Sequence, residues 1–367
     1  MWTFPGIGSR AKNDLEAPAP TRVAQEAIMA SDLARFFHYA QAFELAWLGD
    51  GWGHLADHFT ADALHVVHGG GAFGDGASGR AAVVDGLRDS TRRVDRRFDV
   101  RIPEILEGPI VRPDGVWMRY ALTLRRAGLP DFRFEGRHLA AYERGRIRSL
   151  EDWPEPGTAG RLAAYLATHA SRLHPEGGVA PPALSPNDVR DLDAAVARSL
   201  ARSYGAAKSQ QDIDAALAVC SEDFVLETMP LGLAARGRGE ARRQLETFFG
   251  AFPDYRVTVE GIAAEGASVA CWGRALMTFD GPFLGFAPTG RAADLPFVSV
   301  FACEGGALRG ERFYFDLATL CDRIGVPVAE MAGVAATLAA DTSGSEPARS
   351  AAEPAPRNEA TAAAALG

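Results

Sequence analysis

The chain lacks an excess of basic residues. Its 367 residues include 38 lysines and arginines against 47 aspartates and glutamates, which gives a formal net charge of −9. A protein that binds nucleic acid needs a basic surface to neutralise phosphates. We therefore expect no nucleic-acid partner.

Cysteine is scarce and shows no metal-binding pattern. The four cysteines all lie in the second half and none forms a C-x-x-C pair: Cys220, Cys271, Cys303 and Cys321. This distribution argues against a disulfide scaffold and against a zinc site. We expect reduced thiols, no bound metal and a cytoplasmic location.

Targeting segments and cofactor motifs are also missing. The first twenty residues carry Arg10, Lys12, Asp14 and Glu16 and no apolar core of a signal peptide. No run approaches the roughly 20 apolar residues of a membrane span. Phosphate-binding loops, dinucleotide fingerprints and the common hydrolase signatures are absent as well. We expect no membrane association and no cofactor.

Three segments have the composition of arms or linkers. Residues 1–25 are polar and contain prolines, so we expect a flexible arm, and the Ala-, Pro- and Ser-rich residues 341–367 predict a disordered tail. The Pro- and Gly-rich residues 175–185 predict a linker. Residues 26–174 and 186–340 are then expected to form one domain each.

The two predicted domains show the same order of patterns. Each opens with a helix-capping signal, at Ser31 and at Ser185, followed by apolar residues at helical spacing. Each continues with stretches of period-two alternation, which indicate strands with one buried face. Helices followed by a run of strands predict an α+β fold. We expect two tandem cone-shaped domains, each a curved, mostly antiparallel sheet wrapped around helices with a small-molecule cavity inside.

Specific motifs lie between residues 237 and 326. They read G-R-G-E-A from Gly237, F-G-A-F-P-D-Y from Phe249, G-P-F-L-G-F-A-P-T-G-R from Gly281 and E-R-F-Y-F-D-L from Glu311. In this order they resemble the SnoaL-like polyketide cyclases and related ester cyclases of the nuclear transport factor 2-like superfamily. The first half resembles the superfamily only in its general pattern. Within the motifs, Pro288 and Gly290 are typical of a turn, so a structural loop is expected there.

The resemblance implies an intramolecular aldol-type ring closure without metal or cofactor. Such chemistry needs a base to remove a proton α to a carbonyl and a donor to hold the enolate oxygen. The resemblance also implies dimerisation through the outer sheet face. A tandem repeat could satisfy that contact internally, as a pseudo-dimer, and a further homo-oligomer stays open.

The last strand of the second domain carries the first set of candidate catalytic residues. Asp316 is the candidate base, Tyr314 a candidate oxyanion donor and Arg312 a neighbour that could pair with Asp316, because alternate residues share a strand face. Asp316 could equally cap the helix that follows. Four further residues are candidates for substrate binding: Glu227, Trp272, Arg274 and Asp294. Relatives often carry a histidine shortly before the Gly-Pro-Phe run, and here Met277 to Asp280 contain none.

The first domain offers a different set of candidates. His138 and Asp152 lie on neighbouring predicted strands and could form an acid–base pair inside the cone. Arg119 and Trp153 are further candidates for substrate binding. His65 and His68 differ by three positions on a strand, so they should face opposite ways and not share a metal.

Two classes of function remain. The first is a cofactor-free cyclase or isomerase that removes a proton α to a carbonyl of a hydrophobic, polyketide-like small molecule. The alternative is a non-catalytic binding or scaffold protein with a degenerate SnoaL-like pocket. A third possibility is that one repeat is catalytic and the other is its structural partner.

Overall fold

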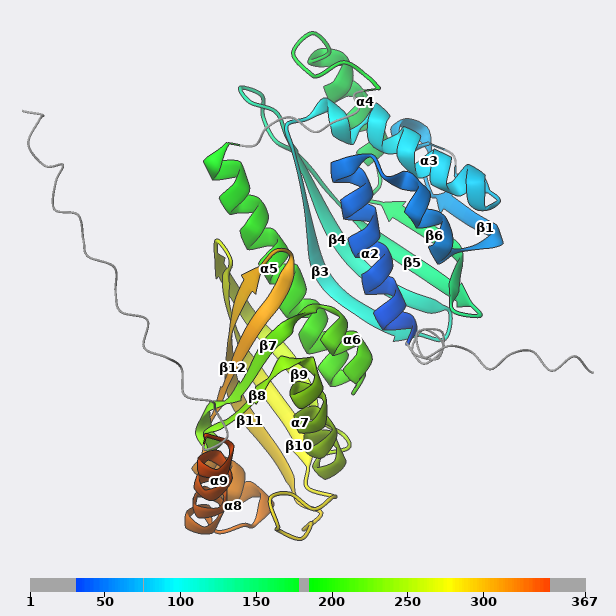
Figure 1. The fold of residues 1–367 in the computed structure, drawn as a ribbon. Helices are drawn as coiled ribbons and strands as arrows, with labels where there is room; N and C mark the ends of the chain where they lie inside the picture. The colour runs from blue at the N-terminus through cyan, green and yellow to red at the C-terminus, as the bar shows by residue number, and fades with distance from the viewer. Residues whose placement is uncertain (1–30, 75, 178–184, 344–367) are drawn as a thin grey trace, which may run out of the picture.

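The computed structural model describes residues 31–74, 76–177 and 185–343. They form two α+β units, each built on one six-stranded sheet with helices against it (Figure 1). The predicted fold class is therefore confirmed. The predicted arm, residues 1–25, lies outside the described residues, and so does the predicted tail, residues 341–367, except for residues 341–343, which are the end of a helix.

The first domain runs from a long helix through a curved sheet to a short closing helix. Its elements are α2 (Asp32–Gly49), η1 (Trp52–His58), β1 (Phe59–Val67), η2 (Gly71–Phe73), β2 (Ala77–Ser78), α3 (Arg80–Arg93), η3 (Asp95–Arg97), β3 (Val100–Arg112), β4 (Gly115–Arg125), β5 (Phe132–Glu143), β6 (Arg146–Pro154) and α4 (Thr158–Thr168). The strands are ordered β2-β1-β6-β5-β4-β3. Only the β1/β6 pair is parallel, and the other pairs are antiparallel.

The second domain has the same order of strands. Its elements are α5 (Pro186–Ser209), α6 (Ile213–Ala218), β7 (Cys220–Thr228), η4 (Met229–Leu231), β8 (Leu233–Arg236), α7 (Gly237–Ala251), β9 (Arg256–Glu265), β10 (Ser268–Thr278), β11 (Ala292–Glu304), β12 (Ala307–Phe315), α8 (Leu317–Ile324) and α9 (Val328–Ser343). Its sheet reads β8-β7-β12-β11-β10-β9, again with one parallel pair, β12/β7. The two sheets thus have the same topology.

Both long opening helices begin where the capping signals predict. The Ser31 side chain accepts a hydrogen bond from the Ala34 amide, and Ser185 forms a capping box with Asp188. Each cap satisfies an amide that has no partner inside the helix. Local sequence therefore sets the start of α2 and of α5.

Helix α5 packs against both domains. Ala195 is buried against Val100 and Ile102 of β3, the edge strand of the first sheet. The Ser199 hydroxyl accepts a hydrogen bond from the Ile105 amide at 3.1 Å, so a side chain of α5 occupies an otherwise free edge amide. Two clusters of ion pairs reinforce the contact: Arg198 with Glu104, and Arg125 with Asp188 and Asp191.

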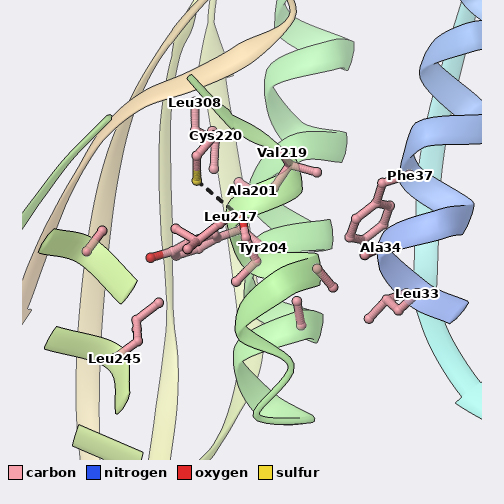
Figure 2. Close-up of a cluster of buried hydrophobic side chains, with 14 of the residues drawn as sticks. Leu33, Ala34, Phe37, Ala201, Tyr204, Leu217, Val219, Cys220, Leu245 and Leu308 are labelled. Carbon is pink, nitrogen blue, oxygen red and sulfur yellow. Dashed lines mark hydrogen bonds between the residues drawn. The ribbon is translucent and has the colours of Figure 1, made fainter. Parts of the chain in front are cut away.

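A second contact joins α2 to the helices of the other domain. Leu33, Ala34 and Phe37 of α2 belong to the same buried cluster as Leu217 of α6 (Figure 2). The domains therefore meet through α5, α6, α2 and β3. This corrects the expectation of a pseudo-dimer packed through the outer sheet faces, because Trp272 and Tyr314 on the outer face of the second sheet are 43% and 38% exposed.

No helix among the described residues is by itself long and apolar enough to cross a membrane. Only the bent pair Leu317–Ile324 and Val328–Ala340, at 119° to each other, meets the criterion of length and composition together.

Candidate functional site

Three polar side chains meet inside the first domain. Nδ1 of His138 on β5 lies 2.8 Å from Oδ1 of Asp152 on β6, and Nε2 of His65 on β1 lies 3.1 Å from Oδ2. The sheet register explains the meeting, since His138 is directly opposite Asp152 and β6 lies between β5 and β1. The predicted pairing of His138 with Asp152 is confirmed, and His65 completes a group of three.

The protonation of this group follows from its hydrogen bonds. An ionised carboxylate only accepts, so the nitrogens that face Asp152 carry the protons. In neutral His138 the proton is then on Nδ1, and Nε2 keeps its lone pair. His138 is 7% exposed, and its Nε2 is buried without a hydrogen-bond partner in the described part of the chain. A buried, unpartnered nitrogen held in one tautomer is the feature expected of a general base.

Asp152 is held in its charged form. Burial alone would raise the pKa of Asp152, but the positive charge that His138 carries when protonated, together with the hydrogen bonds from His138 and His65, outweighs burial and lowers the pKa. Asp152 therefore stays ionised over the working pH range. It can orient His138 and stabilise the imidazolium that forms when Nε2 takes a proton.

Aromatic side chains surround the three polar groups. The ring of Phe36 on α2 lies 5.7 Å from the ring of His138. Burial, together with the negative charge of Asp152, raises the pKa of Tyr39 and of Tyr120, so both hydroxyls stay protonated. A protonated phenol in an apolar environment can donate to a developing enolate oxygen. Sequence reasoning missed Tyr39, and its only signal is its position three residues after Phe36, on the same helix face.

Within the described residues, no group of three or more His, Cys, Asp or Glu side chains is arranged to hold a metal ion. His65 and His138 bind separate oxygens of one carboxylate, so their nitrogens point at Asp152. The arrangement is suited to proton transfer.

The other first-domain candidates lie away from this group. His68 bonds Glu151 at 2.9 Å and stacks on Trp153 with ring centroids 4.5 Å apart, so the opposite orientations predicted for His65 and His68 are confirmed. Arg119 is exposed and pairs with Glu107 and Glu135. Trp153 and Arg119 follow the other face of the sheet because they alternate with the inward residues Asp152 and Met118.

Asp316 caps the helix that follows the last strand. Its carboxylate accepts a hydrogen bond from the Thr319 amide at 2.5 Å, and this bond lowers the pKa of Asp316. The side chain is exposed. Of the two alternatives left open by the sequence, the structure shows the cap. The expectation that Asp316 points into an apolar cavity is wrong.

Arg312 and Tyr314 also face outward. Arg312 is exposed and pairs with Glu227 at 2.9 Å rather than with Asp316. Tyr314 is 38% exposed. The sequence could not show which face of β12 turns inward, because a bulge next to Arg309 puts Leu308 and Glu311, three residues apart, on the same buried face.

The remaining second-domain candidates lie on the outer face of the sheet as well. Arg274 and Asp294 form an exposed ion pair at 2.8 Å, and Trp272 covers Gly261. A side chain at Gly261 would place its Cβ 2.2 Å from the Trp272 ring. The structure therefore does not bring these residues together into a pocket inside the cone.

A buried ion pair occupies the interior of the second domain instead. Nζ of Lys208, one of only two lysines in the chain, lies 3.1 Å from Oε2 of Glu311, and Ser299 donates to Oε1 at 2.8 Å. Glu311 is 2% exposed and Lys208 6%. Sequence reasoning missed both residues, although an isolated lysine in an apolar helix stripe is a usable signal.

The space beside this pair is small. A cavity of about 20 Å³, lined by Tyr204, Tyr255, Cys271, Lys208 and Glu311 among others, is room for about one water molecule. The Tyr204 hydroxyl has no partner within hydrogen-bond geometry among the described residues. This cavity is too small to hold a substrate.

The Gly281–Arg291 motif forms a structural loop, as expected. Gly290 has φ +67°, and the Thr289 hydroxyl donates to the Ile324 carbonyl at 2.6 Å. The guanidinium of Arg291 donates to the Asp322 carbonyl at 3.0 Å. These bonds fasten the loop to the end of α8, which explains why the motif identifies the fold rather than the chemistry.

Several solved structures are similar to parts of the chain. A protein described as a SnoaL-like polyketide cyclase from a Jannaschia species is 23% identical over 40% of this chain and 98% of its own, with a TM-score of 0.35. AclR from Streptomyces galilaeus, described as a hydroxylase, is 24% identical over 36% of this chain and 99% of its own, with a TM-score of 0.33. A protein with a ketosteroid isomerase-like fold from Catenulispora acidiphila is 16% identical over 35% and 95%, with a TM-score of 0.32.

Comparison with sequence families identifies one region. No curated protein sequence matches the chain at a significant level. The model of the SnoaL-like polyketide cyclase family matches residues 198–324, from within α5 to the end of α8. Most of the second domain therefore resembles the SnoaL-like polyketide cyclase family.

Proposed function

We propose that the protein is a cofactor-free cyclase or isomerase whose proton-transfer site is in the first domain, with His138 as the general base. The observation that carries the proposal is the buried, unpartnered Nε2 of His138, whose Nδ1 is fixed by Asp152 at 2.8 Å. The family match of the second domain supports the coarser class of cyclase or isomerase chemistry. The aromatic surroundings favour a hydrophobic carbonyl compound.

The reaction can be written from these residues. Nε2 of His138 takes a proton from the carbon α to a carbonyl, and the electron pair moves to the carbonyl oxygen as an enolate. The hydroxyls of Tyr120 and Tyr39 are the candidate donors to that oxygen, and Asp152 stabilises the imidazolium. Return of the proton to another carbon completes an isomerisation, whereas attack of the enolate carbon on a second carbonyl closes a ring.

The second domain then acts as a support for this site. Helix α2 carries Phe36 and Tyr39 towards the polar group and Phe37 towards the helices of the second domain (Figure 2). Because the interior of the second domain is filled by its own ion pair, we infer a structural role for it. Its packing holds the helix that covers the site.

The test follows hydrogen–deuterium exchange by NMR. A panel of hydrophobic ketones and β-keto esters is incubated with the full chain in D2O, and exchange at the α-carbon is measured. His138→Gln should lower the exchange rate by about 100- to 10,000-fold, the usual contribution of a general base. Asp152→Asn should also lower it, because the preferred tautomer of His138 is lost.

His68→Gln is the matched control. His68 is on the same sheet and also bonds a carboxylate, but it lies on the outer face, so exchange should be unchanged. Equal exchange rates in wild type and His138→Gln would refute the proposal. Ligands that bind but never exchange would instead support the non-catalytic binding protein.

A further inference from the structure

A pocket separate from the His138 site lies on the first domain. It measures about 350 Å³ and is formed by the start of β1, the start of α3 and the turn between β5 and β6. Its lining residues are Thr60, Ala61, Asp62, Arg80, Glu143, Arg144 and Arg146. None of them belongs to the His138 group, and the volume is within the range of small-molecule sites.

The charge balance of this pocket is unusual for an acidic protein. Three of its lining residues are arginines, in a chain of net charge −9. Both acidic residues of the pocket are influenced by a further arginine, Arg148: Glu143 lies 3.9 Å from it, and its charge acts on Asp62. Across the described residues, no carboxylate lies within ion-pair distance of Arg80, Arg144 or Arg146.

Two further observations give the pocket a positive field. The Nε of Arg80 is buried and has no hydrogen-bond partner among the residues that the structure describes. Helix α3 begins at Arg80, its N-cap Gly79 offers no side-chain hydrogen bond, and its first turn contains no acidic residue. The positive end of the helix dipole therefore adds to the guanidinium charges.

We propose that this pocket binds the oxyanion group of a small molecule that carries at least two negative charges, of the phosphate or pyrophosphate type. Guanidinium groups match such oxyanions because they donate two parallel hydrogen bonds at a fixed spacing. Three of them around one cavity can contact the oxygens from several sides. The site is independent of the proton-transfer proposal, since it shares no residue with it.

The test is isothermal titration calorimetry of the full chain with sodium pyrophosphate and with inorganic phosphate. We expect saturable binding, tighter for pyrophosphate because of its greater charge, and weaker with added KCl. Arg144→Gln/Arg146→Gln should weaken pyrophosphate binding by about 100-fold, about tenfold for each lost charged contact. Both side chains are exposed, so the fold should tolerate the change.

Arg243→Gln, an exposed arginine on α7 of the other domain, is the matched control and should leave binding within about twofold. Exchange at the α-carbon by His138 should be the same in all these variants. Absence of saturable binding to the wild type at millimolar pyrophosphate would overturn the proposal. Binding to the double variant as tight as to the wild type would overturn it too.

Discussion

Replacing Lys208 with methionine tests the interior of the second domain directly. Methionine keeps most of the apolar stem of Lys208, whose ammonium nitrogen lies 4.9 and 5.0 Å from the ring centroids of Tyr204 and Phe313. What disappears is the positive charge beside Glu311. The variant therefore leaves a carboxylate that is 2% exposed without its counter-ion.

The magnitude follows from the geometry. Two unit charges 3.1 Å apart attract each other by about 5 kcal/mol at the effective dielectric constant of about 20 that suits protein sites. The hydrogen bond from Ser299 to Glu311 is present in both the wild type and the variant, so it does not enter the difference in stability. A loss of about 3–5 kcal/mol in the free energy of unfolding is expected, the range for a buried pair with one partner removed.

Urea unfolding of the full chain, followed by circular dichroism, measures the loss. The double variant Lys208→Met/Glu311→Met removes both charges, so it should recover most of the lost stability or exceed that of the wild type. A single variant that loses less than about 1 kcal/mol would refute the reasoning. A double variant as unstable as the single one would show that packing, not the unpaired charge, controls the result.

Two predictions concern other sites. Burial raises the pKa of Asp95 from 3.8 to about 6, so the folded state favours its protonated form. The stability that this protonation contributes is present at low pH and lost as the pH rises from about 4 to about 6, by about 3 kcal/mol in all. Asp95→Asn should flatten the dependence of the urea midpoint on pH in that window, and an unchanged slope would contradict the assignment. Gly281→Ala should lower the free energy of unfolding by about 2 kcal/mol or more, because its Cβ would lie 1.9 Å from the Gly250 carbonyl oxygen. Gly250→Ala is the control, since its Cβ would meet nothing within 4 Å. Equal melting temperatures of the two variants would contradict this prediction.

The fold was predictable because its signals are local. The capping residues Ser31 and Ser185 predict where two helices begin, and period-two alternation predicts the strands. The pairing of His138 with Asp152 was predictable for a similar reason, since both lie on adjacent strands of a meander. The proximity of His65 required the parallel β1/β6 pair, which no local signal indicates.

The prediction that Asp316, Tyr314 and Arg312 face a cavity was wrong because the sequence does not show which face of the strand is buried. Apolar residues occur on both faces of β12, so Phe313 and Tyr314 gave no indication of which face is buried. The bulge next to Arg309 then shifted the phase, so that the buried carboxylate is Glu311. The resemblance drew attention to this strand, but a one-residue phase error exchanges every inward residue for an outward one.

The contact between the two domains could not be predicted from the sequence either, because it depends on the complementary shapes of two folded surfaces. Val100 and Ile102 look like ordinary core residues of a strand, and their partner Ala195 lies across the predicted linker. Small residues on α5 allow the helix to approach the strand closely. Such complementarity has no periodic signature.

The position of α5 has a consequence for how the chain can be divided. If the chain is divided within residues 178–184, α5 stays with the second domain and no longer covers β3. The free edge amides and apolar residues of β3 would then face water. An uncovered edge strand pairs readily with other chains. A fragment ending before α5 should therefore associate with itself, whereas one that extends through Ser209 carries its own edge protection.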